Sequence, residues 1–413
     1  MCGLQRRLHQ YKMHWQVNYD KEYARSLDTQ RRYGYLRETI IKVTAGFPKG
    51  NTLNIDKIAA LPGMDQSLVR KMRDGFPLPT DSFEPKVYKN YKSMQGCAKY
   101  ASEEWDRLAQ KGKLRWFSSR PPGLNVVPCA GIIKERKGDI DFDDPNLSWH
   151  LKYKLRIITD MRKARVNDLV LWEYLKVEMC SLSDVVNDIK RGDWLYIIDI
   201  SDCFFHWKIL PEDSMKCGVY DEYKERWGVL DFFGFGCRGA PAINFICLSH
   251  ILRCAPGRLK IFVDDMIDGM PSELAAFEQM EDQVIFLLEC GICPTVKVSG
   301  LVAPCQNIVY TGHVIDTVKM KAETTLEKRS KARRKTAKVV EDGKVKAKEL
   351  LSCTGLLNHL CELDPGGRRH LRGSWNLINE FELNKVFSKS KHANPIITLS
   401  EEALAGLKWW IDR

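Results

Sequence analysis

The chain has 413 residues, with 64 Lys or Arg against 53 Asp or Glu and a formal net charge of +11, which suits a polyanionic partner. This length predicts two or three domains, and a hydrophobic fraction of 44% excludes a mostly disordered chain. No apolar window is long enough for a transmembrane helix, no signal sequence is present, and fourteen scattered cysteines are typical of reduced thiols. We therefore expect an intracellular protein, cytoplasmic or nuclear, that does not bind membranes.

The first 193 residues contain few regular patterns. Residues 1–69 carry many charges without clear periodicity, so their role is unknown. The elements predicted after them are a helix from Met94 to Lys111 that ends at Gly112, strands at 124–127 and 130–133, an acid-rich loop at 139–144, an apolar strand ending at Asp160, and a short helix at 181–190 that begins at Ser181 or Ser183.

Strands, helices and hairpins alternate from Trp194 to Thr311, a pattern that predicts an α+β sheet backed by helices. Beyond Asp316 the composition becomes strongly basic and helical. This segment is either a solvated face, a nuclear-import signal, or a helix that lies along a phosphate backbone. Its candidate backbone contacts are Lys328, Arg329, Lys331, Arg333, Arg334 and Lys335.

Three carboxylates lie at the ends of two predicted buried strands. Asp264 and Asp265 lie at the bend of a predicted hairpin, with a further turn predicted at Asp268-Gly269, and Asp199 ends an apolar run 65 residues earlier. Mg²⁺ prefers such hard oxygen ligands, and two ions clamp the attacking and leaving oxygens of a phosphoryl displacement. Since Asp is also common at ordinary turns, the motifs around the pair decide its interpretation.

Five segments resemble, in order and rough spacing, the motifs of reverse transcriptases. They are Asp199-Ile-Ser-Asp-Cys-Phe204, Phe233-Gly-Phe-Gly-Cys-Arg-Gly-Ala-Pro-Ala242, Phe262-Val-Asp-Asp265, Gly291-Ile-Cys-Pro-Thr-Val-Lys297 and Tyr310-Thr-Gly-His313. Upstream, Arg156, Asp160 and Arg162 are similar to the fingers pattern Arg-x-x-x-Asp-x-Arg. The segments Asp364-Pro-Gly-Gly-Arg368 and 399–410 resemble retrotransposons that use a tyrosine recombinase (DIRS-like elements). The resemblance covers roughly residues 70–413.

The resemblance implies an α+β right-hand polymerase with fingers, a palm built on a βαββαβ-like antiparallel sheet backed by helices, and a helical thumb. The predicted regions are 1–69 of unknown role, 70–198 with an N-terminal helix, the fingers and the start of the palm, 199–315 with the palm motifs and primer grip, 316–395 as thumb and connection, and 396–413 as the truncated start of a downstream, ribonuclease H-like region.

The resemblance also assigns catalytic roles. Asp199 and Asp264 would ligate two Mg²⁺ ions, for which Mn²⁺ is a possible substitute, Asp265 would support the site, and the Ile200 carbonyl would complete one coordination sphere. Lys297 would protonate the departing pyrophosphate as a general acid. The implied partners are an RNA template, a DNA or RNA primer and deoxynucleoside triphosphates, while the oligomeric state is not indicated.

Nucleotide and primer contacts follow in the same way. Guanidinium groups recognise phosphate bidentately, so Arg156 and Arg162 would hold the triphosphate, with Lys134 as a further candidate. The other implied nucleotide-binding residues are Asp202 through its backbone N–H, Cys203, Phe204, Phe235 and Gly236, and the implied primer grip is Tyr310, Thr311, Gly312 and His313.

Two alternatives to a reverse transcriptase stay open. An RNA-dependent RNA polymerase usually has a second Asp where this chain has Phe204, whose ring would collide with a ribose 2′-hydroxyl. A degenerate, non-catalytic nucleic-acid-binding scaffold would not need the intact carboxylates. Three departures from the family pattern bear on activity: the acidic loop at 139–144, the late position of Asn167, and Cys203 in place of the usual Ala.

Overall fold

The computed structural model describes residues 19–78, 83–135, 148–171, 173, 177, 180–297, 300–381 and 394–412. They form two compact units. The first comprises the described residues before Cys180, together with Ile197–Asp268 and Leu274–Ala303; the second comprises Cys180–Tyr196, Gly269–Glu273 and the described residues from Pro304 onward. The predicted acidic loop at 139–144 lies outside the described residues.

A four-stranded sheet in the order β7-β8-β4-β9 carries the predicted acids. Its strands are β4 (Trp194–Asp199), β7 (Lys260–Phe262), β8 (Asp265–Met270) and β9 (Leu301–Cys305). The strand predicted before Asp199 is confirmed, and its four central residues are buried. The predicted hairpin is confirmed as well, since β7 and β8 pair antiparallel with Phe262 opposite Asp265.

The turn predicted at Asp268-Gly269 is wrong, because both residues lie inside β8. The Asp268 carboxylate accepts a hydrogen bond from Gln283 at 2.7 Å instead of capping a turn. Gly269 is needed for packing: a Cβ at this position would lie 2.4 Å from the Leu195 side chain. Glycine here permits close approach within a strand.

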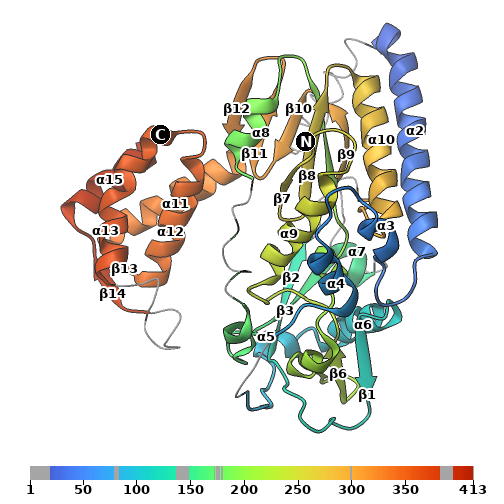
Figure 1. The fold of residues 1–413 in the computed structure, drawn as a ribbon. Coiled ribbons are helices and arrows are strands. Elements are labelled where there is room, and N and C mark those ends of the chain that lie inside the picture. Colours follow the sequence, from blue (N-terminus) through green and yellow to red (C-terminus); the bar gives the residue numbers. More distant parts are fainter. Residues whose placement is uncertain are drawn as a thin grey trace. The chain divides into compact units, whose positions relative to one another are not determined.

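Helices cover the sheet of the first unit (Figure 1). The bounds of these helices are α2 (Tyr19–Ala45), α9 (Ala240–Leu252) and α10 (Glu273–Glu289). α9 packs against β7, and α2 lies along α10, where Arg32 pairs with Glu281 at 2.7 Å. The sequence showed no periodicity for α2, yet Leu36 and Ile40 on it are buried.

The rest of the first unit consists of short helices and two small sheets. One sheet has the order β1-β6-β5 and the other is the hairpin β2-β3. The bounds are α3 (Ile55–Ala59), α4 (Gln66–Asp74), α5 (Lys92–Gln95), α6 (Ala98–Gln110), α7 (Trp149–Lys152), β1 (Leu114–Phe117), β2 (Cys129–Glu135), β3 (Tyr153–Thr159), β5 (Gly218–Asp221) and β6 (Arg226–Leu230).

Most elements predicted here are confirmed, but the strand at 124–127 is wrong. The segment is buried, and Val126 forms isolated bridges with Val87 and Gly218 instead of a continuous ladder. Pro128 follows directly, and a proline has no N–H to extend a ladder. The helix predicted from Met94 to Lys111 is divided between α5 and α6, with Gly112 following at a positive φ of 70°.

The second unit contains a three-stranded sheet and a group of helices. Its elements are α8 (Leu182–Asp188), β10 (Asn307–Tyr310), β11 (His313–Asp316), β12 (Lys321–Thr324), α11 (Leu326–Asp342), β13 (Lys344–Lys346), α12 (Ala347–Leu360), α13 (Arg372–Glu380), β14 (Ile396–Thr398) and α15 (Glu401–Asp412). α8 confirms the short helix predicted at 181–190, with Ser181 forming a capping box with Asp184.

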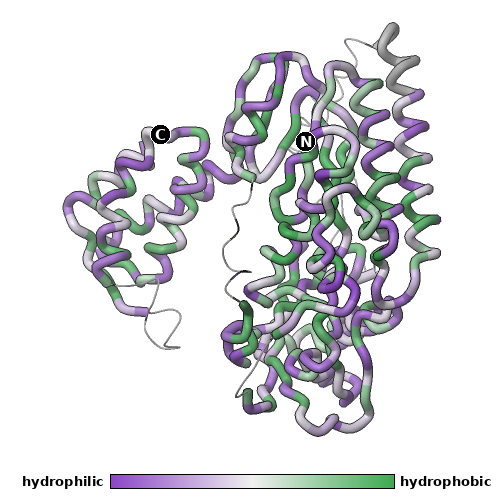
Figure 2. Tube along the Cα trace, viewed as in Figure 1, coloured by the Kyte–Doolittle hydropathy of each residue, from purple (hydrophilic) through white to green (hydrophobic). Residues whose placement is uncertain are grey.

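Hydrophobic and hydrophilic residues alternate along α11, α12 and α15 (Figure 2), as expected for helices with one face in a core. That core joins α11, α12, α13, β13, β14 and α15, with Leu350, Leu357 and Leu407 among its buried members. The predicted regions 316–395 and 396–413 therefore contribute to one core where the structure describes them. No helix among the described residues is long and apolar enough to cross a membrane.

Candidate active site

The carboxylates of Asp199, Asp264 and Asp265 converge in the first unit. One oxygen from each lies within 4.8 Å of the others. β4 supplies Asp199 at its last residue, and the β7–β8 hairpin supplies the other two. The sequence alone thus identified three side chains that the fold brings together across 65 residues. We call this group the carboxylate trio.

Backbone hydrogen bonds fix the end of β4 on both sides. The Asp199 N–H donates to the Gly300 carbonyl at 2.7 Å, and the Asp199 carbonyl accepts from the Thr295 N–H at 2.8 Å. The N–H of Ile200 donates to the Asp264 carbonyl at 3.3 Å. These backbone bonds hold Asp199 and Asp264 in register.

Asn244 on α9 holds the hairpin turn, a role that the sequence did not indicate. Its side chain is fully buried, and its amide donates to the Val263 carbonyl. Its Oδ1 accepts from the Trp207 indole at 2.7 Å and from the Cys203 thiol at 2.9 Å. Val263 adopts a φ of 60°, which is costly for a β-branched residue. Such strain persists only where surrounding bonds enforce it.

The trio resists full ionisation. Burial, and then the charges of Asp264 and Asp265, raise the pKa of Asp199 to about 7. Burial, and then the charge of Asp264, raise the pKa of Asp265 to about 6, and burial raises the pKa of Asp264. Closely spaced buried carboxylates behave in this way because like charges disfavour the ionised forms. A divalent cation would relieve the repulsion, so the donor set fits Mg²⁺.

Three basic side chains lower the pKa values of carboxyl groups in the trio. The charges of Arg156 and Lys154 oppose the rise in the Asp264 pKa, and Lys297 opposes the rise in the Asp199 pKa. In the β2–β3 hairpin, Ile132 pairs with Arg156 and Lys134 pairs with Lys154, so these side chains share one face. Lys154 was missed from the sequence because it matches no motif position.

Two aromatic rings meet beside the trio's strand. Phe204 and Phe235 contact edge to face, with ring centroids 5.6 Å apart, and Phe235 is 44% exposed. The Phe235 carbonyl accepts two hydrogen bonds from Thr159, from its N–H at 3.0 Å and its hydroxyl at 2.6 Å. The structure therefore brings together two residues that the sequence assigned separately to nucleotide contacts.

Gly236 occupies a position that no other residue could fill. Its φ is 116°, and a Cβ would lie 1.8 Å from the Thr159 carbonyl oxygen. Asn167 donates to the Gly236 carbonyl at 3.0 Å and accepts from the Arg238 N–H at 2.8 Å. The late position of Asn167 in the sequence thus still allows it to hold this loop.

Asp202 and Cys203 do not direct their side chains toward a nucleotide. The Asp202 carboxylate pairs with Arg107 at 2.6 Å and Lys111 at 2.8 Å. Burial would raise its pKa, but these two cations outweigh burial and hold the pKa well below its usual range. The Cys203 thiol is buried against Asn244. Any nucleotide contact from either residue would therefore come from its backbone.

The remaining predicted residues of the first unit are exposed at the surface. Arg156, Arg162, Lys134 and Lys297 all have solvent-accessible side chains. Ile200, by contrast, is buried, which is compatible with a backbone role only. Every described cysteine is a free thiol, and no cluster of possible metal ligands among the described residues includes a cysteine.

The predicted primer-grip residues lie in the second unit, at the β10–β11 hairpin. Tyr310 pairs with His313 across a two-residue turn, in which Thr311 and Gly312 have φ values of 48° and 86°. Positive φ at both positions is the type I′ geometry that favours tight hairpins. Tyr310 and His313 are both buried.

The basic segment forms α11 as predicted, but its cations do not share one exposed face. Lys331 and Arg334 are exposed at helical spacing, and Arg329 and Arg333 are exposed on another side. Lys328 instead donates to the Thr311 carbonyl at 2.9 Å, and Lys335 bonds the Ser352 hydroxyl. Both ammonium groups therefore have protein partners, and the assignment of Lys328 and Lys335 to a phosphate backbone stays a prediction.

Comparison with known proteins identifies the fold. No model of a known protein family matches the sequence, and no curated protein matches it. The foamy viral protease-reverse transcriptase dRH in complex with double-stranded DNA is similar, with a TM-score of 0.52 and 18% identity over 81% of this chain and 50% of that one. The foamy viral enzyme with an RNA/DNA hybrid gives 0.52 and 17% identity over 81% and 38%.

A further complex of that enzyme with double-stranded DNA gives a TM-score of 0.52 and 16% identity over 86% of this chain and 69% of that one. The chain spans about half the length of the first of these structures. At such low identities the likeness bears on the fold alone. The chain has a reverse-transcriptase-like fold of mixed helices and sheets.

Proposed function

We propose that the protein is an RNA-directed DNA polymerase that adds deoxynucleotides to a primer 3′-hydroxyl, with the carboxylate trio binding two Mg²⁺ ions. The observation that carries the proposal is the meeting of three carboxylates within 4.8 Å in a fold similar to a viral protease-reverse transcriptase. In the terms of that fold, the four-stranded sheet is the palm, the β2–β3 hairpin belongs to the fingers, and α11–α13 form the thumb. The retrotransposon origin is part of the same proposal.

Bound Mg²⁺ would supply charge neutralisation for both oxygens of the displacement. The chain's own residues would position the reactants, which is most of what phosphoryl transfer requires. Asp199 and Asp264 would be the principal ligands, with Asp265 and the Ile200 carbonyl in support. Arg156 and Lys154 act electrostatically on Asp264 and would also neutralise the triphosphate. Lys297 would deliver a proton to pyrophosphate.

The structure offers a physical basis for choosing deoxyribonucleotides over ribonucleotides. The Phe204 ring is held against Phe235, and the loop of Phe235 is fixed in turn by Thr159. A ring supported in this way would resist displacement by a 2′-hydroxyl. This support favours DNA synthesis over the alternative of RNA synthesis.

The decisive experiment is primer extension on an RNA template with Asp264→Asn. We expect at least about a hundredfold loss of rate, because the variant removes one metal ligand from a charge-stabilising site. The matched control is Asp268→Asn, which removes a carboxylate from the adjacent strand β8, where it bonds Gln283, and which should retain activity. Equal extension by Asp264→Asn and the parent protein would refute the metal assignment, and complete inactivity of the folded parent would favour the scaffold alternative.

A second substitution separates DNA synthesis from RNA synthesis. Phe204→Ala should raise ribonucleotide incorporation relative to deoxynucleotides by about tenfold or more, because the steric block is removed. Phe205→Ala is the control, since that ring packs against Gly234. Competition between the two nucleotide types in single-nucleotide extension measures the ratio. An unchanged ratio in Phe204→Ala would rule out this residue as the sugar gate.

A further inference from the structure

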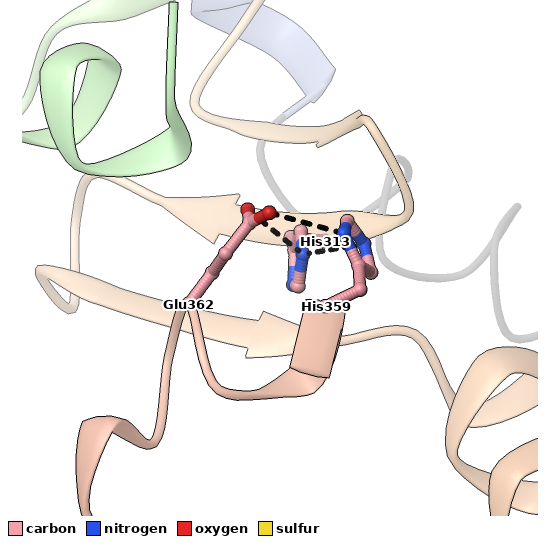
Figure 3. Close-up of side chains that lie close together, drawn as sticks. All are labelled: His313, His359 and Glu362. Atoms are coloured by element: carbon pink, nitrogen blue, oxygen red, sulfur yellow. Dashed lines mark hydrogen bonds and ion pairs between the residues drawn. The ribbon is translucent and has the colours of Figure 1, made fainter. Parts of the chain in front are cut away.

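Two histidines and a glutamate meet in the second unit, as Figure 3 shows. His313 is the first residue of β11, His359 lies in the last turn of α12, and Glu362 follows that helix by two residues. The Nε2 atoms of the two histidines are 3.0 Å apart. The Glu362 carboxylate lies 3.1 Å from His359 Nδ1 and 3.8 Å from His313 Nε2. One ligand atom from each residue lies within 4.8 Å of the others.

One of the two histidines is held in a ligand-like orientation by a residue outside the cluster. His313 is fully buried, and its Nδ1 lies 3.3 Å from the Thr324 hydroxyl, so that Nε2 faces the cluster. Metal-bound histidines almost always use their second ring nitrogen for such a hydrogen bond.

We propose that His313, His359 and Glu362 form a Zn²⁺ site, a second metal site whose chemistry differs from that of the carboxylate trio. Two imidazoles and one carboxylate match the ligands of zinc, and bond lengths of roughly 2.0–2.2 Å put tetrahedral ligand atoms about 3.3 Å apart. The observed 3.0 and 3.8 Å separations to His313 Nε2 lie on either side of that value. Imidazole ligands favour zinc over magnesium. The fourth position is open to water.

Lys328 is the competitor for this site. Its ammonium contacts His359 Nε2 and donates to the Thr311 carbonyl at 2.9 Å. If zinc binds His359 through Nε2, the metal ion and the Lys328 ammonium cannot share that nitrogen. Zinc binding then requires the half-exposed lysine to swing outward and the Glu362 carboxylate to turn from His359 Nδ1 toward the metal. The metal-free cluster is thus held by Lys328 and the metal-bound cluster by zinc. In either form the hairpin turn of Thr311 and Gly312 is tied to α12.

The test uses the full chain with Asp264→Asn, which weakens metal binding at the trio, after removal of metals by chelation. Titration with Co²⁺ alone should give one equivalent of binding with the strong visible absorption of a four-coordinate site, and Zn²⁺ should displace it. Glu362→Gln and His359→Gln should each weaken binding by at least about tenfold. Both side chains are partly exposed, and circular dichroism confirms that the variants fold. His150→Gln is the matched control, an exposed imidazole 2.6 Å from Glu103.

Lys328→Met supplies the sharpest comparison. Removing the ammonium while keeping an unbranched stem should tighten Co²⁺ binding by about threefold or more, because one competitor is lost. Binding that is unchanged in both Glu362→Gln and His359→Gln, or an absence of binding in the parent and in Lys328→Met, would overturn the proposal. Absorption from cobalt–thiolate charge transfer would assign the metal to cysteines and overturn it equally. These measurements contain no nucleotide, so their outcome is independent of polymerase activity.

Discussion

Asp199 ends a strand whose preceding residues are buried, and this position sets the chemistry of its carboxyl group. Burial and two neighbouring acids raise its pKa to about 7, and Asp265 is raised to about 6. Residues with strongly perturbed pKa values cluster at functional sites. Without a bound metal ion, the trio therefore lowers the free energy of unfolding at neutral pH.

The stability of the folded protein should depend on pH through the trio. Between the unfolded pKa of 3.8 and the folded values, the folded protein binds more protons than the unfolded chain, so its stability falls as pH rises from about 4 to about 7. Allowing for solvent screening, we expect a loss on the order of 1–3 kcal/mol in chelator. Thermal unfolding across this pH range measures it, and Mg²⁺ should restore stability at neutral pH.

Asp199→Asn tests whether the trio causes this pH dependence of stability. It removes the most strongly perturbed carboxyl group, so its unfolding temperature in chelator should vary less across the same pH range and respond less to Mg²⁺. A pH profile identical to that of the parent would show that the trio does not carry the effect. Asp268→Asn again serves as the charge-matched comparison.

Individual residues also show where the sequence was informative. The trio was predictable because Mg²⁺ prefers carboxylate oxygens, and because these acids lie beside apolar runs. Asn244 was not, because an asparagine inside a helix carries no motif, and its function depends on Val263, Cys203 and Trp207 lying around it. The sequence suggested a phosphate contact for Lys328, and it could not show that this side chain also contacts a carbonyl and an imidazole.

Alternating residues of the paired strands β2 and β3 form a cationic face. Cross-strand pairing places Lys134 opposite Lys154 and Arg156 one alternation away. The sequence indicated Lys134 and Arg156 from family patterns, but only the register reveals Lys154. A two-residue periodicity is visible in the sequence, whereas the identity of the facing residue depends on the strand pairing.

Lys154→Gln should raise the KM for deoxynucleotides by about three- to tenfold while changing kcat little, because it removes a charge that favours bound triphosphate without touching the reacting atoms. Steady-state single-nucleotide extension separates the two constants. The control is Lys99→Gln, because Lys99 is an exposed lysine on α6 and does not belong to this cationic face. A change in kcat alone would show that Lys154 acts on the chemical step instead of nucleotide binding.

Across the whole molecule, the order of motifs predicted a polymerase-like fold, and the structural likeness supports the fold at that level. The structure divides into two compact units. This division does not test the five predicted regions, which stay a prediction. The sequence could not reveal that 396–412 share a core with α11–α13, since such packing depends on contacts between distant segments. The role of α2 was hidden for the same reason.

The attachment of α2 has a kinetic consequence for synthesis. Arg32, Tyr33 and Arg37 bond to residues that follow them by 249, 268 and 259 positions. At roughly 5–20 residues per second, a ribosome needs on the order of 10–50 s to deliver those partners. Throughout that interval the apolar side of the nascent helix, with Leu36 and Ile40, has no native surface to cover it. The first described helix thus leaves the ribosome long before the strand to which Tyr33 bonds, and we expect the nascent chain to be a client for chaperones during translation.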